Sequence, residues 1–319
     1  MISVIIPTRN TRDLTLRCLA TLAASTEVPA EIFLVDDGGR DGTSDAVRAA
    51  YPHTCILEHH DSRGFTASIN AAWPLASGDI VLLLNSDTEV GRDALAHIAA
   101  AFARDERLGV AGATLWHPAV GGEKSQRQWS AGREPTPLWL FVMASGLSST
   151  LGRLPGWRRM RPESQATGDG AAAWVPATAM AIRREVTTAI GLFDPDFALY
   201  AQDLDYCLRA RAAGWRIAQL HDVDVVHIGG ATIMGRTRPA AAAAGAAASG
   251  LRQDPIALFG DLARWLRKER RGTWALRAGC RVRVVARQLL RFRYRGAARE
   301  AWDRETDRYR AALIAIDAC

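Results

Sequence analysis

Polar and acidic side chains follow three predicted strands at the point where each strand ends. Asn85-Ser86-Asp87 follow the apolar run Ile80–Leu84, Asp36-Asp37 follow Glu31–Val35, and Pro7-Thr8-Arg9-Asn10 close the first strand. Ligands of open α/β sheets bind beyond the carboxyl ends of the strands. Oxygen ligands at that point suit a hard cation, which would hold a phosphate. The residues predict a nucleotide-diphosphate site, with turn and helix-cap roles as the alternative for each acid.

Alternating strands and helices position these residues. Apolar runs predict strands at Ile2–Pro7, Glu31–Val35, Cys55–Glu58, Ile80–Leu84, Val110–Leu115, Trp215–Leu220 and Val223–Ile228. Helical patterns cover Thr11–Ala24, Asp41–Tyr51, Gly64–Ala76, Asp93–Ala103, Arg183–Ile190 and Ala201–Ala213, with a perturbation at Pro74 and a C-cap at Gly214. This order predicts an α/β fold with a Rossmann-like, mostly parallel sheet and helices on both faces.

Composition excludes several classes of protein. The 319 residues contain no apolar run of 18, so no membrane-spanning helix is expected. The chain opens on a strand pattern, so no signal peptide is expected. Five scattered cysteines without a CxxC pair favour a reduced, cytoplasmic protein over a disulfide or zinc framework. The sequence has no GxGxxG and no Walker motif, which removes the main support for a dinucleotide or ATPase site.

The basic character of the chain belongs to its C-terminal segment. Residues 251–319 carry 17 Lys or Arg against 8 Asp or Glu, with arginines interleaved among Trp, Leu, Phe and Tyr. We expect this segment to be a helical extension, joined by an Ala/Gly linker at 239–250. An anionic membrane surface is one expected partner for it. Packing as a helical cap is the equal alternative, and no nucleic-acid partner is expected because no recognition motif accompanies the charge.

A series of motifs, in the family's order, resembles family 2 glycosyltransferases of the GT-A fold, and the bacterial rhamnosyltransferase-like branch in particular. The first four are Ile5-Ile6-Pro7-Thr8-Arg9-Asn10, Val35-Asp36-Asp37-Gly38-Gly39, Arg63-Gly64-Phe65 with Asn70, and Asn85-Ser86-Asp87-Thr88. The second half adds Gly191-Leu192-Phe193-Asp194, Gln202-Asp203-Leu204-Asp205 with Ala213-Gly214-Trp215, and Val226-His227-Ile228-Gly229-Gly230. The resemblance covers roughly residues 1–235.

The resemblance implies a GT-A catalytic domain at 1–238, with a nucleotide-sugar half at 1–115 and an acceptor half at 116–238. It implies an inverting, metal-dependent glycosyltransferase that builds cell-surface polysaccharide. The implied donor is a nucleotide-diphosphate sugar, with dTDP-rhamnose favoured over UDP- and GDP-sugars. The implied acceptor is a glycan or lipid-linked sugar. The enzyme would then be cytoplasmic and peripheral on the inner face of the plasma membrane.

The resemblance also assigns roles to residues. Asp36 and Asp37 match the acidic pair that meets the base and ribose of the donor. Asp87 matches the metal-binding aspartate of the DxD-type motif, whose first position here is Asn85, and His227 matches a histidine that completes a Mg²⁺ or Mn²⁺ site. The residues expected to bind the nucleotide sugar are Pro7, Thr8, Asn10, Asp36, Asp37, Arg63, Asn70, Asn85 and Ser86.

Asp203 matches the catalytic base, and Asp205 is its rival. Gln202 stands where the family usually has Glu, a departure that affects base tuning or acceptor contacts. Gln202, Asp205 and Trp174 are therefore candidate acceptor residues. A catalytically inactive GT-A-like sugar-nucleotide binding protein is the main alternative, and a nucleotidyltransferase is the more distant one.

Overall fold

The computed structural model describes residues 1–25, 30–118, 124–148, 170–197, 199–229 and 254–318. These residues divide into two compact units. The first lies within Met1–Gly132, Gln165–Pro195 and Asp203–Arg252, and the second within Arg133–Ser164, Asp196–Gln202 and Gln253–Cys319. The predicted Ala/Gly linker at 239–250 lies outside the described residues.

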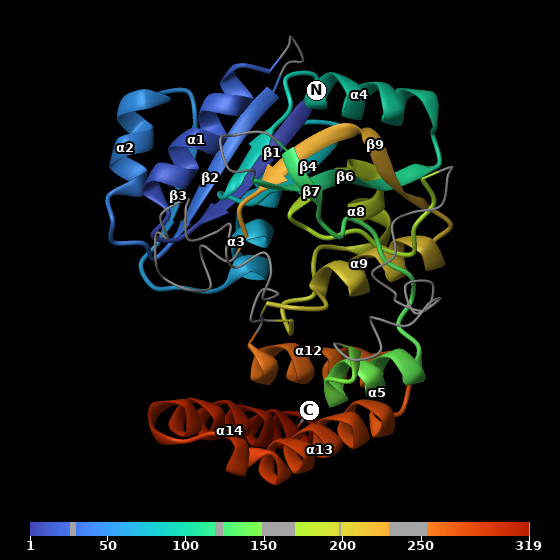
Figure 1. The fold of residues 1–319 in the computed structure, drawn as a ribbon. Helices are drawn as coiled ribbons and strands as arrows, with labels where there is room; N and C mark the ends of the chain where they lie inside the picture. Colours follow the sequence, from blue (N-terminus) through green and yellow to red (C-terminus); the bar gives the residue numbers. More distant parts are fainter. Residues whose placement is uncertain (26–29, 119–123, 149–169, 198, 230–253, 319) are drawn as a thin grey trace. The chain divides into compact units, whose positions relative to one another are not determined.

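A nine-stranded sheet organises the first unit (Figure 1). Its strands run in the order β3-β2-β1-β4-β8-β6-β9-β5, and β7 pairs with β6. Strands β3, β2, β1 and β4 are parallel, as are β6 and β9, whereas β8, β5 and β7 pair antiparallel to their neighbours. The strands are β1 (Ile2–Thr8), β2 (Ala30–Asp37), β3 (Cys55–His59), β4 (Ile80–Leu84), β5 (Thr88–Val90), β6 (Leu108–Pro118), β7 (Lys124–Arg127), β8 (Ala179–Arg183) and β9 (Arg216–His227).

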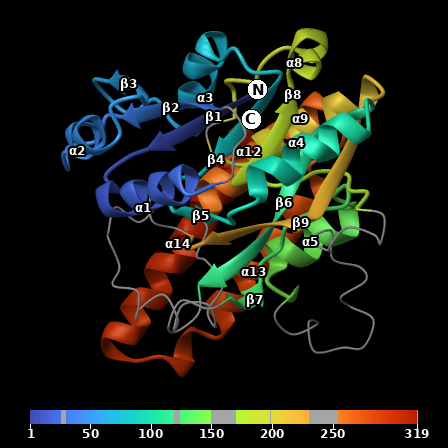
Figure 2. The same ribbon diagram turned by 90° about the horizontal axis from the view of Figure 1, so that it is seen from above.

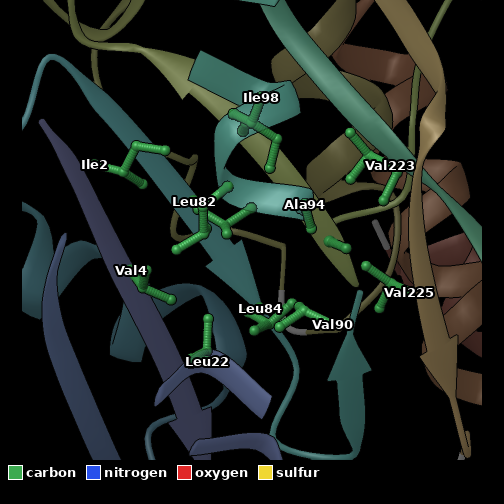
Figure 3. Packing of buried hydrophobic residues seen from close by; sticks show 14 of the residues in the cluster. Ile2, Val4, Leu22, Leu82, Leu84, Val90, Ala94, Ile98, Val223 and Val225 are labelled. Atoms are coloured by element: carbon green, nitrogen blue, oxygen red, sulfur yellow. The ribbon is translucent and has the colours of Figure 1, made fainter. Parts of the chain in front are cut away.

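Helices cover both faces of this sheet (Figure 2), as the sequence predicts. They are α1 (Arg12–Ala23), α2 (Thr43–Ala50), α3 (Phe65–Ala72), α4 (Ala94–Arg104), α8 (Arg184–Ile190) and α9 (Gln202–Ala212), with a 3₁₀ turn η1 (Trp73–Leu75). Alternate residues of β4 point to opposite faces. Leu82 and Leu84 join a core with Leu22 of α1 and Ile98 of α4 (Figure 3). Val81 and Leu83 instead join the core under α3, α8 and α9.

Some of the observed strands and helices depart from the sequence prediction. The two strands predicted at Trp215–Leu220 and Val223–Ile228 are one strand, β9, because a register shift accommodates the polar pair His221-Asp222 without ending the ladder. Strands β5 and β7 were not expected from the sequence, since each is too short to show a period. The predicted helix Gly64–Ala76 is confirmed up to Ala72 and tightens into η1 at Pro74.

The second unit is helical, which confirms the prediction for the C-terminal segment. It contains α5 (Pro137–Ser145), α12 (Pro255–Lys268), α13 (Trp274–Leu289), a 3₁₀ turn η3 (Arg291–Arg293) and α14 (Gly296–Ala318). Helix α13 packs against α5 and α14, and α12 packs against α14. The Asp254 side chain accepts a hydrogen bond from the Ile256 amide and caps α12, with Pro255 in its first turn. Within the described residues, no helix combines the length and apolarity needed to cross a membrane.

Candidate active site

The polar ends of β1, β2 and β4 lie at one edge of the sheet, as the sequence predicts. Parallel pairing sets Thr8 beside Asp36, and β4 pairs with β1 in the same direction. A buried group of hydroxyls ties this edge together: Thr11 Oγ1 lies 2.8 Å from Thr8 Oγ1 and 2.9 Å from Ser86 Oγ, and Thr15 completes the group. The loops after β1 and β4 are therefore joined by uncharged hydrogen bonds. Pro7, also a predicted donor residue, lies half-buried in β1.

The Asp36 carboxylate shapes the loop after β2. Its Oδ1 accepts a hydrogen bond from the Gly39 amide at 2.8 Å, and its Oδ2 accepts one from Ser44 Oγ at 2.9 Å. A Cβ at Gly39 would lie 2.5 Å from Asp36 Oδ1, so the turn requires glycine. Asn10 adopts a positive φ of 54° and accepts a hydrogen bond from the Arg40 amide at 2.7 Å. Asp36 and Asn10 thus hold the loop that borders the site.

Asp37 is the most heavily hydrogen-bonded acid of this edge. It is buried and accepts hydrogen bonds from His59, Ser62 and the amides of Arg63 and Gly64, at 2.6 to 3.0 Å. Burial alone would raise the pKa of Asp37, but these four donors outweigh it and lower the pKa. Arg63, expected to contact the donor, is exposed and joins this arrangement through its amide. Contacts of Asp36 and Asp37 with base and ribose remain a prediction.

Asp87 and His227 are brought together by the antiparallel pairing of β5 with β9. His227 stands opposite Thr88 in that ladder, and the Ile228 amide donates to Asp87 O at 3.0 Å. His227 Nε2 consequently lies 3.4 Å from Asp87 Oδ1. The Gly229 amide donates to Asp87 Oδ2 at 3.1 Å. Both side chains are largely buried, so a carboxylate oxygen and an imidazole nitrogen converge at one point.

Gln128 orients this histidine, and sequence reasoning missed it. Its Oε1 lies 2.9 Å from His227 Nδ1, while its Nε2 faces the main-chain oxygens of Trp116 and His227. Because those two oxygens can only accept, Nε2 is the donor and Oε1 must accept a proton carried on Nδ1. The proton on Nδ1 leaves the Nε2 lone pair of His227 directed toward Asp87. No motif surrounds Gln128, so only the fold reveals its role.

Asp87 and His227 fit a divalent cation whose coordination is completed by a further, non-protein ligand. Asp87 supplies a hard oxygen, His227 supplies a nitrogen in the required tautomer, and the half-buried Gln128 orients the histidine from behind. The described residues contain no group of three His, Cys, Asp or Glu side chains placed to hold a metal alone. The remaining positions would therefore be filled by water or by diphosphate oxygens. Asn85, half-buried after β4, offers a neutral oxygen at this edge.

Asp203 lies in the first turn of α9 and is joined to the strand edge by a short segment. Asp203 Oδ2 accepts a hydrogen bond from the Ala177 amide at 3.4 Å, and the next residue, Thr178, accepts one from the Asn85 amide at 2.9 Å. Asp203 is half-buried. Desolvation raises the pKa of its carboxyl to about 6, although hydrogen bonds from the Leu204 and Ala177 amides oppose the rise. A carboxylate with that pKa can take up a proton near neutral pH.

The rival carboxylate, Asp205, has a different environment. Asp205 is buried, and its Oδ2 accepts a hydrogen bond from Arg209 Nε at 2.7 Å. Arg209 also donates to the main-chain oxygens of Ile190 and Leu192. Asp205 therefore anchors α9 to the loop before it through Arg209. Gln202 begins the helix with a buried Oε1 that has no hydrogen-bond partner among the described residues.

The remaining predicted residues contribute packing and loop contacts. Asn70 Nδ2 donates to Phe193 O at 2.7 Å, which ties α3 to the loop after α8, and Asn70 Oδ1 is buried. Trp174 is half-buried and meets Trp129 edge-on, with ring centroids 4.5 Å apart. A Cβ at Gly132 would lie 2.4 Å from Trp174 Nε1, so glycine lets the two segments approach. Their contacts with a donor or acceptor remain predictions.

Comparison with known proteins identifies the family. The family model "Glycosyl transferase family 2" matches residues 3–190. The chain is 27% identical over 228 residues to N-acetylglucosaminyl-diphospho-decaprenol L-rhamnosyltransferase of Mycobacterium tuberculosis, covering 66% of this chain and 70% of the relative. It is also 26% identical over 236 residues to the O-antigen biosynthesis protein RfbC of Myxococcus xanthus, covering 71% of this chain and 17% of that protein.

Solved structures support the same fold. The mannosyltransferase PcManGT of Pyrobaculum calidifontis, in complex with GDP-Man and Mn²⁺, has a TM-score of 0.55 at 19% identity, covering 99% of this chain and 86% of that one. GalNAc-T7 with UDP, GalNAc and Mn²⁺ has a TM-score of 0.54 at 16% identity, covering 71% and 43%. The family match, the rhamnosyltransferase relative and the sheet edge agree with the resemblance seen in the sequence. The chain belongs to glycosyl transferase family 2 and is a glycosyltransferase with the GT-A fold.

Proposed function

We propose that this enzyme transfers a sugar from a nucleotide-diphosphate donor to a glycan or lipid-linked acceptor, inverting the anomeric configuration. The observation that carries the proposal is the arrangement at one sheet edge of the Asp87–His227 pair and of Asp203, which the 176–178 segment joins to β4. The relatives named for rhamnosyl transfer and O-antigen synthesis support polysaccharide synthesis as its setting. dTDP-rhamnose is the favoured donor, ahead of UDP- and GDP-sugars.

The residues of the site divide the chemistry between them. Asp87 and His227 would hold Mg²⁺ or Mn²⁺, as the Mn²⁺ complexes of the two structural neighbours suggest. The ion supplies positive charge where negative charge develops on the departing diphosphate. Asp203 accepts the proton of the acceptor hydroxyl, and its raised pKa suits that role at neutral pH. A single displacement by that hydroxyl at the anomeric carbon inverts the configuration.

Hydrogen bonds within the protein preorganise the edge for the donor. The Thr8–Thr11–Ser86 hydroxyls and the Asp37 carboxylate hold their loops in place before any ligand arrives. Preformed loops lower the conformational entropy lost on binding. We propose that Asp36 and Asp37 border the base and ribose, and that Thr8, Asn10, Arg63, Asn70 and Asn85 line the donor site with Pro7 and Ser86.

A donor and acceptor screen tests the proposal. Thermal-shift measurements with dTDP-rhamnose, UDP-sugars and GDP-sugars in Mn²⁺ identify the donor, and transfer assays with that donor follow. We expect a nucleoside diphosphate and a glycosylated product of inverted configuration. Donor binding without hydrolysis or transfer would support the sugar-nucleotide binding protein to which the buried Gln202 points. Release of pyrophosphate would instead identify a nucleotidyltransferase.

A lipid-linked acceptor lies in a membrane, so attachment to that membrane is part of the proposal. We propose that the basic extension, residues 251–319, binds an anionic membrane surface on the cytoplasmic side. Its 17 Lys or Arg against 8 Asp or Glu support this partner.

A further inference from the structure

Helix α13 carries a row of exposed apolar side chains along one face. They recur at helical spacing and continue into η3, and the exposed fractions are Trp274 66%, Val282 41%, Val285 52%, Leu289 68% and Phe292 76%. Positions separated by 8, 11 and 15 residues fall on one side of a helix with 3.6 residues per turn. We call this set the outer face of α13 (helix labelled in Figure 1).

The helix already has a separate face for its own packing. Ala275, Leu276, Gly279, Cys280 and Val284 are buried. A Cβ at Gly279 would lie 2.4 Å from Phe141 O, so α13 and α5 are in close contact there. The outer face is therefore apolar surface beyond what the core of the helical unit uses. Contiguous exposed apolar surface of this kind marks an interaction site.

The charge around the outer face indicates what it meets. Residues 270–299 contain no Asp or Glu, and their ten arginines are Arg270, Arg271, Arg277, Arg281, Arg283, Arg287, Arg291, Arg293, Arg295 and Arg299. Several are neutralised from outside the run, as in the Arg277–Asp317 and Arg291–Asp303 pairs. Arg281, Arg293 and Arg295 are exposed and form no ion pair among the described residues.

A surface that combines Trp, Phe and Leu with unpaired arginines suits the headgroup region of an anionic bilayer. Apolar side chains enter the acyl boundary, a tryptophan stays at the interface, and guanidinium groups meet lipid phosphates. We propose that the outer face of α13 with η3 binds anionic lipid, inserting Val285, Leu289 and Phe292. This inference names the contact face for the proposed membrane attachment, and it rests on the proposed lipid-linked acceptor.

Co-sedimentation of the full chain with vesicles tests the face. We expect binding to phosphatidylcholine vesicles that contain phosphatidylglycerol, and at least tenfold weaker binding to phosphatidylcholine alone. The double variant Leu289→Ser/Phe292→Ser should lower the partition coefficient at least tenfold, because it removes the most exposed apolar side chains of the face. Arg281→Glu/Arg293→Glu should do the same at low salt and lose its effect in high salt.

Matched controls separate the face from general surface properties. Leu75→Ser removes a comparably exposed leucine of η1, and Arg104→Glu reverses an exposed charge at the end of α4. Both should leave vesicle binding unchanged, and thermal unfolding should show all four variants folded. Equal binding to both vesicle types, no binding to either, or equal losses in the controls would each overturn the inference.

Light scattering without lipid tests whether a second copy of the chain, and not lipid, covers the outer face of α13. A dimer that Leu289→Ser/Phe292→Ser converts to monomer would assign the outer face to a second copy of the chain and overturn the lipid proposal. Sugar transfer to a water-soluble acceptor, measured in parallel, keeps the two proposals distinct. Transfer without vesicle binding rejects only the lipid face, and vesicle binding without transfer rejects only the proposed enzymatic function.

Discussion

Gln128 Oε1 lies 2.9 Å from Nδ1 of His227, and this contact places the His227 proton on the nitrogen that faces away from Asp87. The amide of Gln128 is fixed by the main-chain oxygens of Trp116 and His227, so it cannot turn without losing those bonds. A residue outside every recognised motif thereby determines which imidazole nitrogen is available to a cation. An orienting partner of this kind commonly tunes a metal ligand.

Replacing Gln128 should therefore weaken metal binding. We expect Gln128→Ala to lower Mn²⁺ affinity about 10- to 100-fold, because His227 loses its fixed tautomer and ring orientation. Calorimetric titration of Mn²⁺ into the protein with a nucleoside diphosphate present measures this directly, apart from turnover. Gln219→Ala, which removes a buried glutamine from β9, is the control. Equal losses of Mn²⁺ affinity in both variants would show that Gln128 acts only through packing.

Asp87 should be indispensable to both metal binding and turnover. Asp87→Asn should abolish Mn²⁺ binding and lower kcat/KM by more than about 100-fold, since a neutral oxygen replaces the charged ligand. Glu89→Gln makes the same change of charge in β5 and should have little effect. Chelation of the wild type should stop transfer, and added Mg²⁺ or Mn²⁺ should restore it. Full activity in chelator would exclude a metal role.

Asp203→Asn should eliminate transfer while donor binding survives. It should also stabilise the fold by about 1–3 kcal/mol at pH 7, because burial raises the pKa of Asp203 from 3.8 to about 6 and makes its ionised form costly. The native state holds the extra proton between those two values, so wild-type stability falls as pH rises from about 4 to about 6. The variant should lack this fall. Urea denaturation at pH 4 and pH 7 measures it.

The wild-type rate should depend on the same ionisation. The proposed base, Asp203, must be ionised to accept a proton, so kcat should decline as pH drops through about 6. A rate that stays level down to pH 4.5, or near wild-type turnover by Asp203→Asn, would remove Asp203 from the role of base.

Asp205→Asn should show the opposite pattern. It leaves the half-buried Arg209 guanidinium beside a neutral partner, so we expect a loss of about 3 kcal/mol of stability. Turnover per folded molecule should remain within a few fold of wild type, because the proposed base is Asp203 and the Asp205–Arg209 pair positions α9. Active-site titration of the folded fraction makes the comparison. Complete inactivity in fully folded Asp205→Asn would favour Asp205 as the base.

Asp37 should stabilise the fold at neutral pH and lose that effect in acid. Its hydrogen bonds lower its pKa, so its contribution is complete above the ordinary aspartate pKa and disappears as pH falls through the native value. Asp37→Asn should cost about 2–3 kcal/mol at pH 7 and less at pH 3. Denaturant midpoints at the two pH values measure the difference. A constant penalty at both would show that charge is irrelevant there.

The sequence predicts the parts of this fold in which an apolar strand pattern is followed directly by polar residues. Ile80–Leu84 is buried throughout, as its unbroken apolar run indicates, and the polar ends of β1, β2 and β4 meet as parallel strands require. Family resemblance gave Asp87 and His227, which the structure brings together. No pattern in the sequence identifies Gln128, because β7 and the residues after it pair through the fold and carry no local period.

The surroundings of the two carboxylates in α9 also depend on residues that are distant in the sequence. Asp203 and Asp205 are two positions apart and identical in type, yet one is desolvated and the other is paired with Arg209. The Arg209 pairing follows the i, i+4 spacing of a helix and could be anticipated. The desolvation of Asp203 depends on the 176–178 segment lying against it, which no local pattern reveals. The sequence alone therefore left the two carboxylates as rivals.

The register of β5 against β9 determines on which side of the sheet the His227 imidazole lies. Side chains alternate across a strand, so a one-residue deletion in β9 after its register shift would turn the imidazole to the opposite side of the sheet. No intermediate position of the imidazole exists between the two sides, because the strand register can shift only by whole residues. Keeping the His227 imidazole beside Asp87 therefore requires a fixed number of residues from Asp224 to His227, whichever side chains stand on the exposed side of β9.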